Sequence, residues 1–322
     1  MSDPFKNSMT KKFPECFDVD AFAVCFGIDS DQMPDDCREL IDQSDFRYRI
    51  LNGDERDQTL LTVLKRVDQQ KVAVAGKKRI GDWVKGWNEN LQSFLESGNE
   101  EDLTPKYIRP GLPLRFQGKF IQSADANFES NWYRIYRHWL ITTLLQGFDT
   151  IFEFGCGSGH NLPALARLTD ARHIVGLDWA PPSVNIANRL RKSTGLNIQG
   201  RLFNFFEPDF DLVVPANSAF LTIGALEQTG NQFGAFLDFI LNKKPNLCVN
   251  VEPIVELLDK NNLVDYTSFR CEEARNFLRG YVDAIRTLER QGNATILKLV
   301  RSHFGSLMFE SFCQVIWRPS GP

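Results

Sequence analysis

The sequence predicts an α/β fold: a Rossmann-like, seven-stranded, mostly parallel sheet with helices on both faces, preceded by a helical N-terminal extension. Two observations support this. From position 150 onward, apolar runs of strand length alternate regularly with helix-like segments, which is typical of a parallel sheet. The run 150–154 also leads into three glycines at alternate positions and then into a helix-like segment at 162–168, a pattern that indicates a strand, a tight turn and a helix.

The elements of this second part follow one another closely. We expect strands at 150–154, 173–177, 198–203, 218–223 and 247–251, with helices at 160–168, 181–193 and 232–242. Pro181 and Pro182 suit the first turn of the second helix. Further on, a long amphipathic helix is expected from Arg270 to Gln291, and strand-like runs at 295–300 and 312–317 predict a final hairpin with an antiparallel last strand.

Before position 150 the apolar spacing is helical. It predicts one helix near 60–67 and a clearer one at 80–95, whose apolar face carries Trp83 and Trp87. For these two tryptophans, packing is favoured over ligand contact. We therefore expect a mainly helical extension or substrate cap at 1–100 and a second domain at 101–322, with its nucleotide-binding core at 150–318.

A third helix is expected at 131–145, directly before the first core strand. It carries Trp132, Tyr136 and Trp139. These rings either pack the helix onto the sheet or cover a ligand pocket, and the sequence leaves both roles open.

Composition limits the classes of protein. The 322 residues are 43% hydrophobic, which is ample for a packed core, and the net charge is −4 without any basic block. The acidic balance argues against a nucleic-acid partner. The seven cysteines are odd in number and lack C-x-x-C spacing, so neither a disulfide framework nor a structural metal site is expected. Neither a signal peptide nor a membrane span is apparent. We therefore expect a reduced, cytoplasmic protein.

The glycine turn has the pattern E-x-G-x-G-x-G from Glu153 to Gly159. Dinucleotide-binding turns usually require a further glycine where this chain has His160. The next strand ends in Asp178, 19 residues after Gly159, where a nucleotide-binding sheet places a carboxylate for the ribose hydroxyls. Turn, helix, strand and acid in this order predict a nucleoside site.

These motifs resemble those of the class I S-adenosylmethionine (SAM) dependent methyltransferases. The resemblance implies SAM as cofactor and S-adenosylhomocysteine (SAH) as product. No metal cluster is evident in the sequence, so no metal is expected and a metal-assisted mechanism is disfavoured. The resemblance further implies that Glu153 orients the methionine ammonium, that Trp179 packs on the adenine and that Asn204 accepts from the adenine amino group. The implied cofactor-binding residues are Glu153, Gly155, Cys156, Gly157, Gly159, Asp178, Trp179, Asn204, Phe205 and Ile223.

Candidates for the acceptor side follow the later strands. The segment 222–228 is similar to one in many small-molecule methyltransferases, with Gln228 in place of a frequent histidine. Glu227, Gln228 and Glu252 are expected at the crevice, because carboxyl ends of parallel strands border it. Glu252 alternatively caps the following helix. His303 is the candidate general base, and the alternative is a structural histidine.

The function expected is methyl transfer to an oxygen or nitrogen nucleophile of a small molecule or glycan. Further segments near 86–90, 301–307 and 317–319 look like those of a poorly characterised bacterial subgroup of methyltransferases, often linked to surface-glycan or natural-product biosynthesis. Three alternatives remain: a methyltransferase acting on a protein or RNA group, a noncatalytic SAM-binding module, and an NAD-dependent enzyme, which the glycine spacing disfavours. The acceptor and the oligomeric state are left open.

Overall fold

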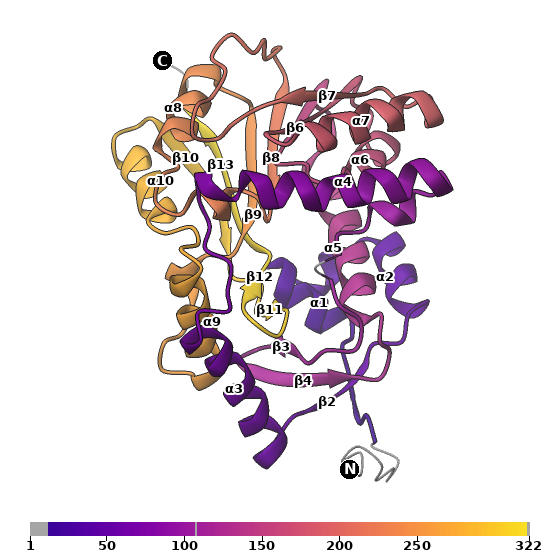
Figure 1. Ribbon diagram of the computed structural model, residues 1–322, viewed down its shortest axis with the longest axis vertical. Coiled ribbons are helices and arrows are strands. Elements are labelled where there is room, and N and C mark those ends of the chain that lie inside the picture. The colour runs from indigo at the N-terminus through magenta and orange to yellow at the C-terminus, as the bar shows by residue number, and fades with distance from the viewer. Residues whose placement is uncertain (1–11, 107, 321–322) are drawn as a thin grey trace.

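A seven-stranded sheet forms the centre of the larger part of the protein (Figure 1). The computed structural model describes residues 12–106 and 108–320. In spatial order the strands are β10 (Ala294–Val300), β13 (Cys313–Pro319), β9 (Leu247–Glu252), β8 (Ser218–Ile223), β5 (Thr150–Phe154), β6 (His173–Asp178) and β7 (Ile198–Leu202). Strand β13 runs antiparallel to both of its neighbours, and the other pairs are parallel. The predicted fold class is confirmed.

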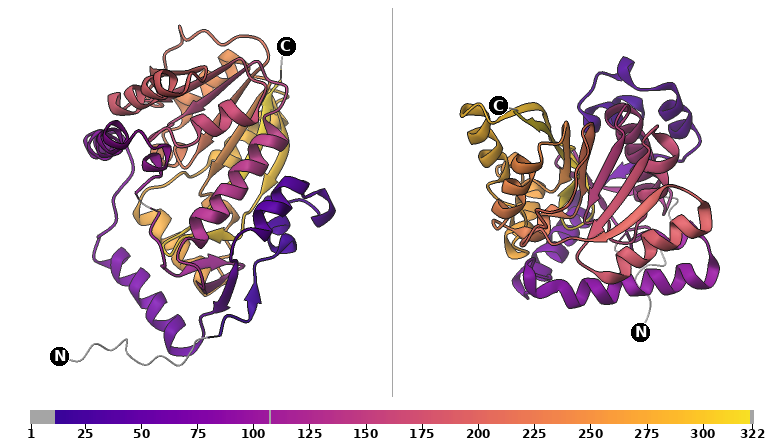
Figure 2. Two further views of the ribbon diagram at one scale, coloured as in Figure 1. Left: turned by 90° about the vertical axis from the view of Figure 1, so that its right-hand side faces the viewer. Right: turned by 90° about the horizontal axis from the view of Figure 1, so that it is seen from above.

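Helices cover both faces of this sheet (Figure 2). Successive strand residues point to opposite faces, so Ile151 packs in one apolar cluster while Phe152 and Phe154 pack in the other. The first face is covered by α5 (Phe128–Leu144), α6 (Leu162–Leu168) and α7 (Pro181–Thr194), and the second by α8 (Gly234–Lys243) and α10 (Tyr281–Arg290). In α5 the rings of Trp132, Tyr136 and Trp139 are fully buried, so they pack the helix onto the core.

The long helix predicted from Arg270 to Gln291 is wrong, because the structure contains two helices here. Helix α9 (Leu263–Ala274) ends before a connection that leads into α10. Within that connection Asn276 has a φ of 53° and Gly280 a φ of 79°. A left-handed backbone conformation ends an α-helix. The apolar spacing in the sequence continues across this connection, but the helix does not.

A second, smaller sheet was not predicted. Its strands, in spatial order, are β1 (Glu15–Cys16), β2 (Arg47–Ile50), β4 (Lys119–Ser123), β3 (Leu114–Phe116), β11 (Phe304–Gly305) and β12 (Glu310–Ser311). Strands this short carry little periodicity, and the pairing of β3 with β11 joins segments far apart in the sequence. The small sheet therefore ties the N-terminal region to the connection between β10 and β13.

The remaining helices belong to the N-terminal region. They are α1 (Val19–Phe26), α2 (Asp35–Asp42), α3 (Gly53–Asp68) and α4 (Ile80–Ser97), with short 3₁₀ turns η1 (Ser30–Gln32), η2 (Lys77–Arg79) and η3 (Glu100–Leu103). Two further turns, η4 (Leu226–Thr229) and η5 (Val255–Leu257), follow β8 and β9. Helix α4 lies across the larger part of the protein, next to α7 (Figures 1 and 2). Within the described part of the chain, every helix is too short or too polar to cross a membrane.

Arg115 of β3 connects the small sheet to α9. Its side chain is 3% exposed, and burial lowers its pKa to about 10. Its guanidinium donates to the backbone carbonyls of Val264, Leu307 and Met308 and to the hydroxyl of Thr267. A single buried side chain thus satisfies acceptors on two separate segments.

Removing this side chain should weaken the whole fold. Arg115→Ala leaves several buried carbonyls without a donor, and we expect the free energy of unfolding to fall by about 3 kcal/mol. Urea denaturation followed by circular dichroism measures the loss. The matched control is Arg172→Ala, whose side chain is 79% exposed. Equal small losses in both variants would contradict this role for Arg115.

Candidate functional site

The glycine turn after β5 is held by backbone hydrogen bonds rather than left open. The amides of Gly155 and Cys156 both donate to the carbonyl oxygen of Leu177, at 2.6 and 3.0 Å. The amide of Gly157 donates to Asp178 Oδ2 at 2.9 Å. A phosphate-binding turn directs such N–H groups at its ligand, so this turn is poorly suited to a pyrophosphate.

Close packing explains two of the three glycines. Gly155 and Gly157 have φ values of 71° and 55°, in the left-handed region. A Cβ on Gly155 would lie 2.4 Å from the Cβ of Ala225, and one on Gly157 would lie 2.8 Å from a ring carbon of Trp87. The turn is thus enclosed by the loop after β8 on one side and by α4 on the other.

Asp178 ends β6 beside this turn, as expected from the sequence. Its Oδ1 accepts from the amide of Ala180 at 2.8 Å, while Oδ2 accepts from Gly157. The side chain is 5% exposed, and burial raises its pKa to about 6.

Glu153 lies at the head of the same turn and is 2% exposed. Its Oε1 accepts from Asn161 Nδ2 at 2.7 Å, and Asn161 Oδ1 in turn accepts from the Tyr133 hydroxyl at 2.8 Å. Glu153 Oε2 has no partner among the described residues. Burial raises the pKa of Glu153 to about 7. A buried carboxylate oxygen without a donor is costly, which makes this atom a candidate ligand contact.

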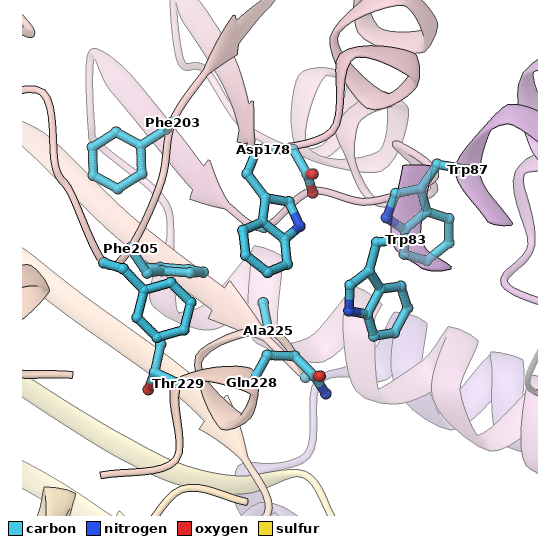
Figure 3. A pocket seen from close by; sticks show the side chains of 12 residues that line it. Trp83, Trp87, Asp178, Phe203, Phe205, Ala225, Gln228 and Thr229 are labelled. Atoms are coloured by element: carbon cyan, nitrogen blue, oxygen red, sulfur yellow. The ribbon is translucent and has the colours of Figure 1, made fainter. Parts of the chain in front are cut away.

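A cavity opens beside the turn (Figure 3). It is lined by Trp83, Trp87, Gly155, Asp178, Trp179, Phe203, Phe205, Phe206, Gly224, Ala225, Gln228 and Thr229. Figure 3 shows Trp83 and Trp87 on one side and Phe203 and Phe205 on the other. The cavity is therefore mostly aromatic, with few polar groups, as binding sites for small organic molecules commonly are.

Trp83 and Trp87 were assigned to packing from the sequence, but they line this cavity. Their rings stack with centroids 5.3 Å apart, and the Arg79 guanidinium lies 4.8 Å from the Trp83 ring centroid. Arg79, Trp83 and Trp87 thus form a column at four-residue spacing. The available signal was two tryptophans one turn apart, which the sequence alone does not distinguish from a core stripe.

The predicted acceptor-side acids lie at the carboxyl ends of the central strands. Glu252 accepts from three backbone amides, those of Ala225, Leu226 and Glu227, at 3.1 to 3.3 Å. It therefore fixes the loop after β8. Glu227 accepts from Gln228 Nε2 at 3.0 Å. Burial and the proximity of the two carboxyls raise the pKa of Glu227, and burial raises that of Glu252.

His303 is not brought to this cavity. It lies in the connection between β10 and β11, where it lines a second cavity together with Asp265 and Arg301. Its backbone φ is 54°, and burial lowers its pKa. The acids Asp265 and Glu310 both pair with Arg301, at 2.5 and 2.7 Å.

Four other predicted residues lie near the turn without lining the cavity. Asn204 Oδ1 accepts from the amide of Phe206 at 3.0 Å, and Cys156 packs against Gly176. Gly159 packs against Ile186 of α7, and Ile223 ends β8. Residues that the sequence analysis missed include Trp83, Trp87, Tyr133, Asn161, Phe203 and Phe206.

Among the described residues, one group has the composition and spacing of a metal site. It comprises Asp36 and Cys37 of α2 and His138 of α5. The Nε2 of His138 lies 2.6 Å from an Asp36 oxygen, so this pair already forms a direct contact between the two helices.

Known proteins similar to this chain are found by structure. No protein-family model matches the sequence, and no curated protein is similar to it. Similar solved structures include N-methyltransferase NodS from Bradyrhizobium japonicum WM9 in complex with S-adenosyl-l-homocysteine (10% identity, 60% of this chain and 88% of that chain, TM-score 0.42). A second is N,N-8-amino-8-demethyl-D-riboflavin dimethyltransferase (RosA) from Streptomyces davawensis (12% identity, 59% of this chain and 56% of that chain, TM-score 0.39). A third is small RNA methyltransferase HEN1 (20% identity, 60% of this chain and 25% of that chain, TM-score 0.42). The similarity is one of fold.

The raised pKa of Glu227 implies that this residue lowers the stability of the folded state by an amount that depends on pH. A buried acid with a raised pKa makes the folded state bind more protons, so stability falls as pH rises above the unfolded value near 4.5. Glu227→Gln removes this cost and keeps an oxygen for Gln228. We expect the variant to melt at least about 2 °C above wild type at pH 9, with a smaller difference at pH 5.

Differential scanning fluorimetry across this pH range makes the measurement. Glu96→Gln is the matched control, because Glu96 is exposed on α4. A Glu227→Gln variant that loses stability equally at both pH values would refute the interpretation.

Proposed function

We propose that the protein is a SAM-dependent methyltransferase that moves the sulfonium methyl group to an oxygen or nitrogen nucleophile of a small molecule or glycan end. The observation that carries the proposal is the unpartnered oxygen of Glu153, buried at the head of a glycine turn. An acceptor-only atom at this position suits an ammonium, which the methionine part of SAM has. It would repel a pyrophosphate, which also disfavours an NAD-dependent enzyme.

The cavity beside the glycine turn fits the nucleoside. Asp178 lies where the ribose hydroxyls would be bound, and Phe203, Phe205 and Trp179 offer aromatic faces for the adenine. Tyr133 and Asn161 would hold Glu153 in orientation through their hydrogen-bond chain. We therefore assign cofactor binding to Glu153, Gly155, Gly157, Asp178, Trp179 and Phe205, and leave Asn204, Cys156 and Ile223 with local structural roles.

The acceptor would enter between α4 and the loop after β8. Helix α4 then acts as the cap that the sequence suggested for residues 1–100. The bound sulfonium supplies an activated methyl group and a good leaving group. The protein's contribution is to hold the nucleophile in line with that methyl and to exclude water with the tryptophans of α4. A pocket lined by aromatic side chains favours a small acceptor over a polymer.

Cofactor affinity should depend on pH through Glu153. An ammonium binds the carboxylate form, so binding below the pKa of about 7 requires loss of a proton. We expect SAH to bind about tenfold more tightly at pH 8 than at pH 6, because of this one group. Isothermal titration calorimetry measures the affinities.

Two comparisons isolate Glu153 in this measurement. Methylthioadenosine has the same nucleoside but lacks the ammonium. The pH dependence of its affinity should therefore lack the contribution of Glu153 and keep any contribution of Asp178. Glu153→Gln should bind SAH more weakly and with a flatter pH profile. Parallel pH profiles for SAH and methylthioadenosine in wild type would count against the assignment.

Methyl transfer itself is tested with labelled SAM and size-fractionated extract of the source organism. Wild type is run beside Asp178→Ala, which should lose ribose binding, and beside Asp238→Ala, an exposed position on α8. Label in the small-molecule or glycan fraction, lost only in Asp178→Ala, supports the proposal. Label in protein or RNA moves the reaction to that class of acceptor. SAH binding without any transferred label favours a noncatalytic SAM-binding module.

A further inference from the structure

Helix α2 of the N-terminal region packs against α5 (Figure 1). Contacts toward both ends of α2 fix how the two helices lie on each other. His138 Nε2 of α5 lies 2.6 Å from Asp36 Oδ2, near the start of α2. One turn earlier in α5, Arg134 donates to the hydroxyl of Ser44, just after α2, at 3.3 Å. The two helices therefore run antiparallel, with the relative position of their side chains set at both ends.

Three different kinds of donor atom converge at this contact. Cys37 Sγ, a carboxylate oxygen of Asp36 and a ring nitrogen of His138 all lie within 4.8 Å of one another. A tetrahedral zinc ion binds such atoms at about 2.0–2.3 Å and so holds them about 3.3–3.6 Å apart. Small side-chain movements are therefore enough for all three to bind one ion, with the Asp36–His138 pair opening slightly. None of the three residues lines the cavity beside the glycine turn, so this site does not depend on the proposed function.

The fold already orients the Asp36 carboxylate. Its Oδ1 accepts from the backbone amide of Cys37 at 2.8 Å, while Oδ2 faces His138. Contacts of this kind hold a ligand in position for a metal. Cys37 is 0% exposed, whereas the side chain of Asp36 is 50% exposed. A bound ion would thus have a buried sulfur ligand and a carboxylate at the surface, through which it can enter.

The donor set selects the class of metal. Mg²⁺ and Ca²⁺ bind oxygen ligands, so a thiol and an imidazole among three donors disfavour both. Zn²⁺ accepts sulfur, nitrogen and oxygen together, and three protein ligands leave its fourth position for water. Spacing along the chain could not indicate this group, because His138 lies 102 positions after Asp36.

The alternative is a hydrogen-bonded pair without a metal. Such a pair needs only Asp36 and His138 and gives no role to the sulfur of Cys37. The two interpretations therefore differ in one observable property, which is whether Cys37 Sγ binds a cation.

We propose that Asp36, Cys37 and His138 bind one Zn²⁺-type cation, which joins α2 to α5. Cys37 binds as the thiolate, and its proton is released to the buffer as the metal–sulfur bond forms. Folding is what brings His138 to the other two ligands, so the ion stabilises the folded state.

Cobalt(II) in place of zinc reports the ligands directly, because a cobalt–thiolate bond gives a charge-transfer band in the near ultraviolet. The reduced full chain, without a histidine tag, is titrated with Co²⁺ and then with Zn²⁺ or with excess Mg²⁺. We expect one Co²⁺ per chain with this band, displaced by Zn²⁺ and not by Mg²⁺. Zn²⁺ should also raise the melting temperature by at least about 2 °C.

Variants assign the ligands. The band should be absent in Cys37→Ser, and His138→Ala should bind Zn²⁺ at least about tenfold more weakly than wild type. The matched controls are Cys16→Ser and His173→Ala, which replace an exposed cysteine and an exposed histidine, and both should behave as wild type.

The proposal is overturned if wild type shows no cobalt–thiolate band, if the band persists in Cys37→Ser, or if it is lost in Cys16→Ser. If Cys37→Ser does not fold, Asp36→Asn decides, because an amide at this half-exposed position keeps an oxygen for the Cys37 amide but removes the negative charge. Its affinity for Zn²⁺ should fall at least about tenfold, and an unchanged affinity would equally overturn the proposal.

Discussion

The candidate site depends on the carboxylate of Asp178. One of its oxygens holds the glycine turn after β5, and the other holds the first turn after β6 through Ala180. Two adjacent strand ends are thereby fixed by one buried side chain. Hydrogen bonds of a charged group to backbone amides are stronger than neutral ones, and burial strengthens them further. The same burial raises the pKa of Asp178 to about 6.

Glu252 performs the equivalent task at the end of β9, three strands away in the sheet. It fixes the loop after β8 by accepting three amides, and that loop positions Ala225 against Gly155 and Gln228 at the cavity. The two carboxylates differ in what they leave available. Asp178 lines the cavity, whereas Glu252 is 0% exposed and is not among the residues that line it. A carboxylate already bound to three amides is a poor general base, so Glu252 is better understood as a support for Gln228 than as a reacting group.

The core of the fold could be predicted from the sequence because its signals are local. The strand–turn–helix pattern around Gly155 and the acid at Asp178 each lie within a few residues, and the structure has them as expected. The small sheet could not be predicted, since strands such as β11 have two residues and gain their stability from a partner about 190 positions earlier. The same limit applies to Trp83: helical spacing marks a buried face, but only the tertiary structure reveals that this face covers a cavity.

The position of α4 follows from apolar packing more than from its ion pairs. Lys77 and Glu207 lie 3.2 Å apart at one end, but both side chains are more than half exposed, and such pairs contribute at most about 1 kcal/mol. By contrast, Leu91 and Phe94 are buried, and each contributes about 1.5–3 kcal/mol. At the other end of the helix, Ser158 of the glycine turn donates to the carbonyl of Leu103 just after α4. The segment that follows α4 and the glycine turn are therefore directly linked by this hydrogen bond.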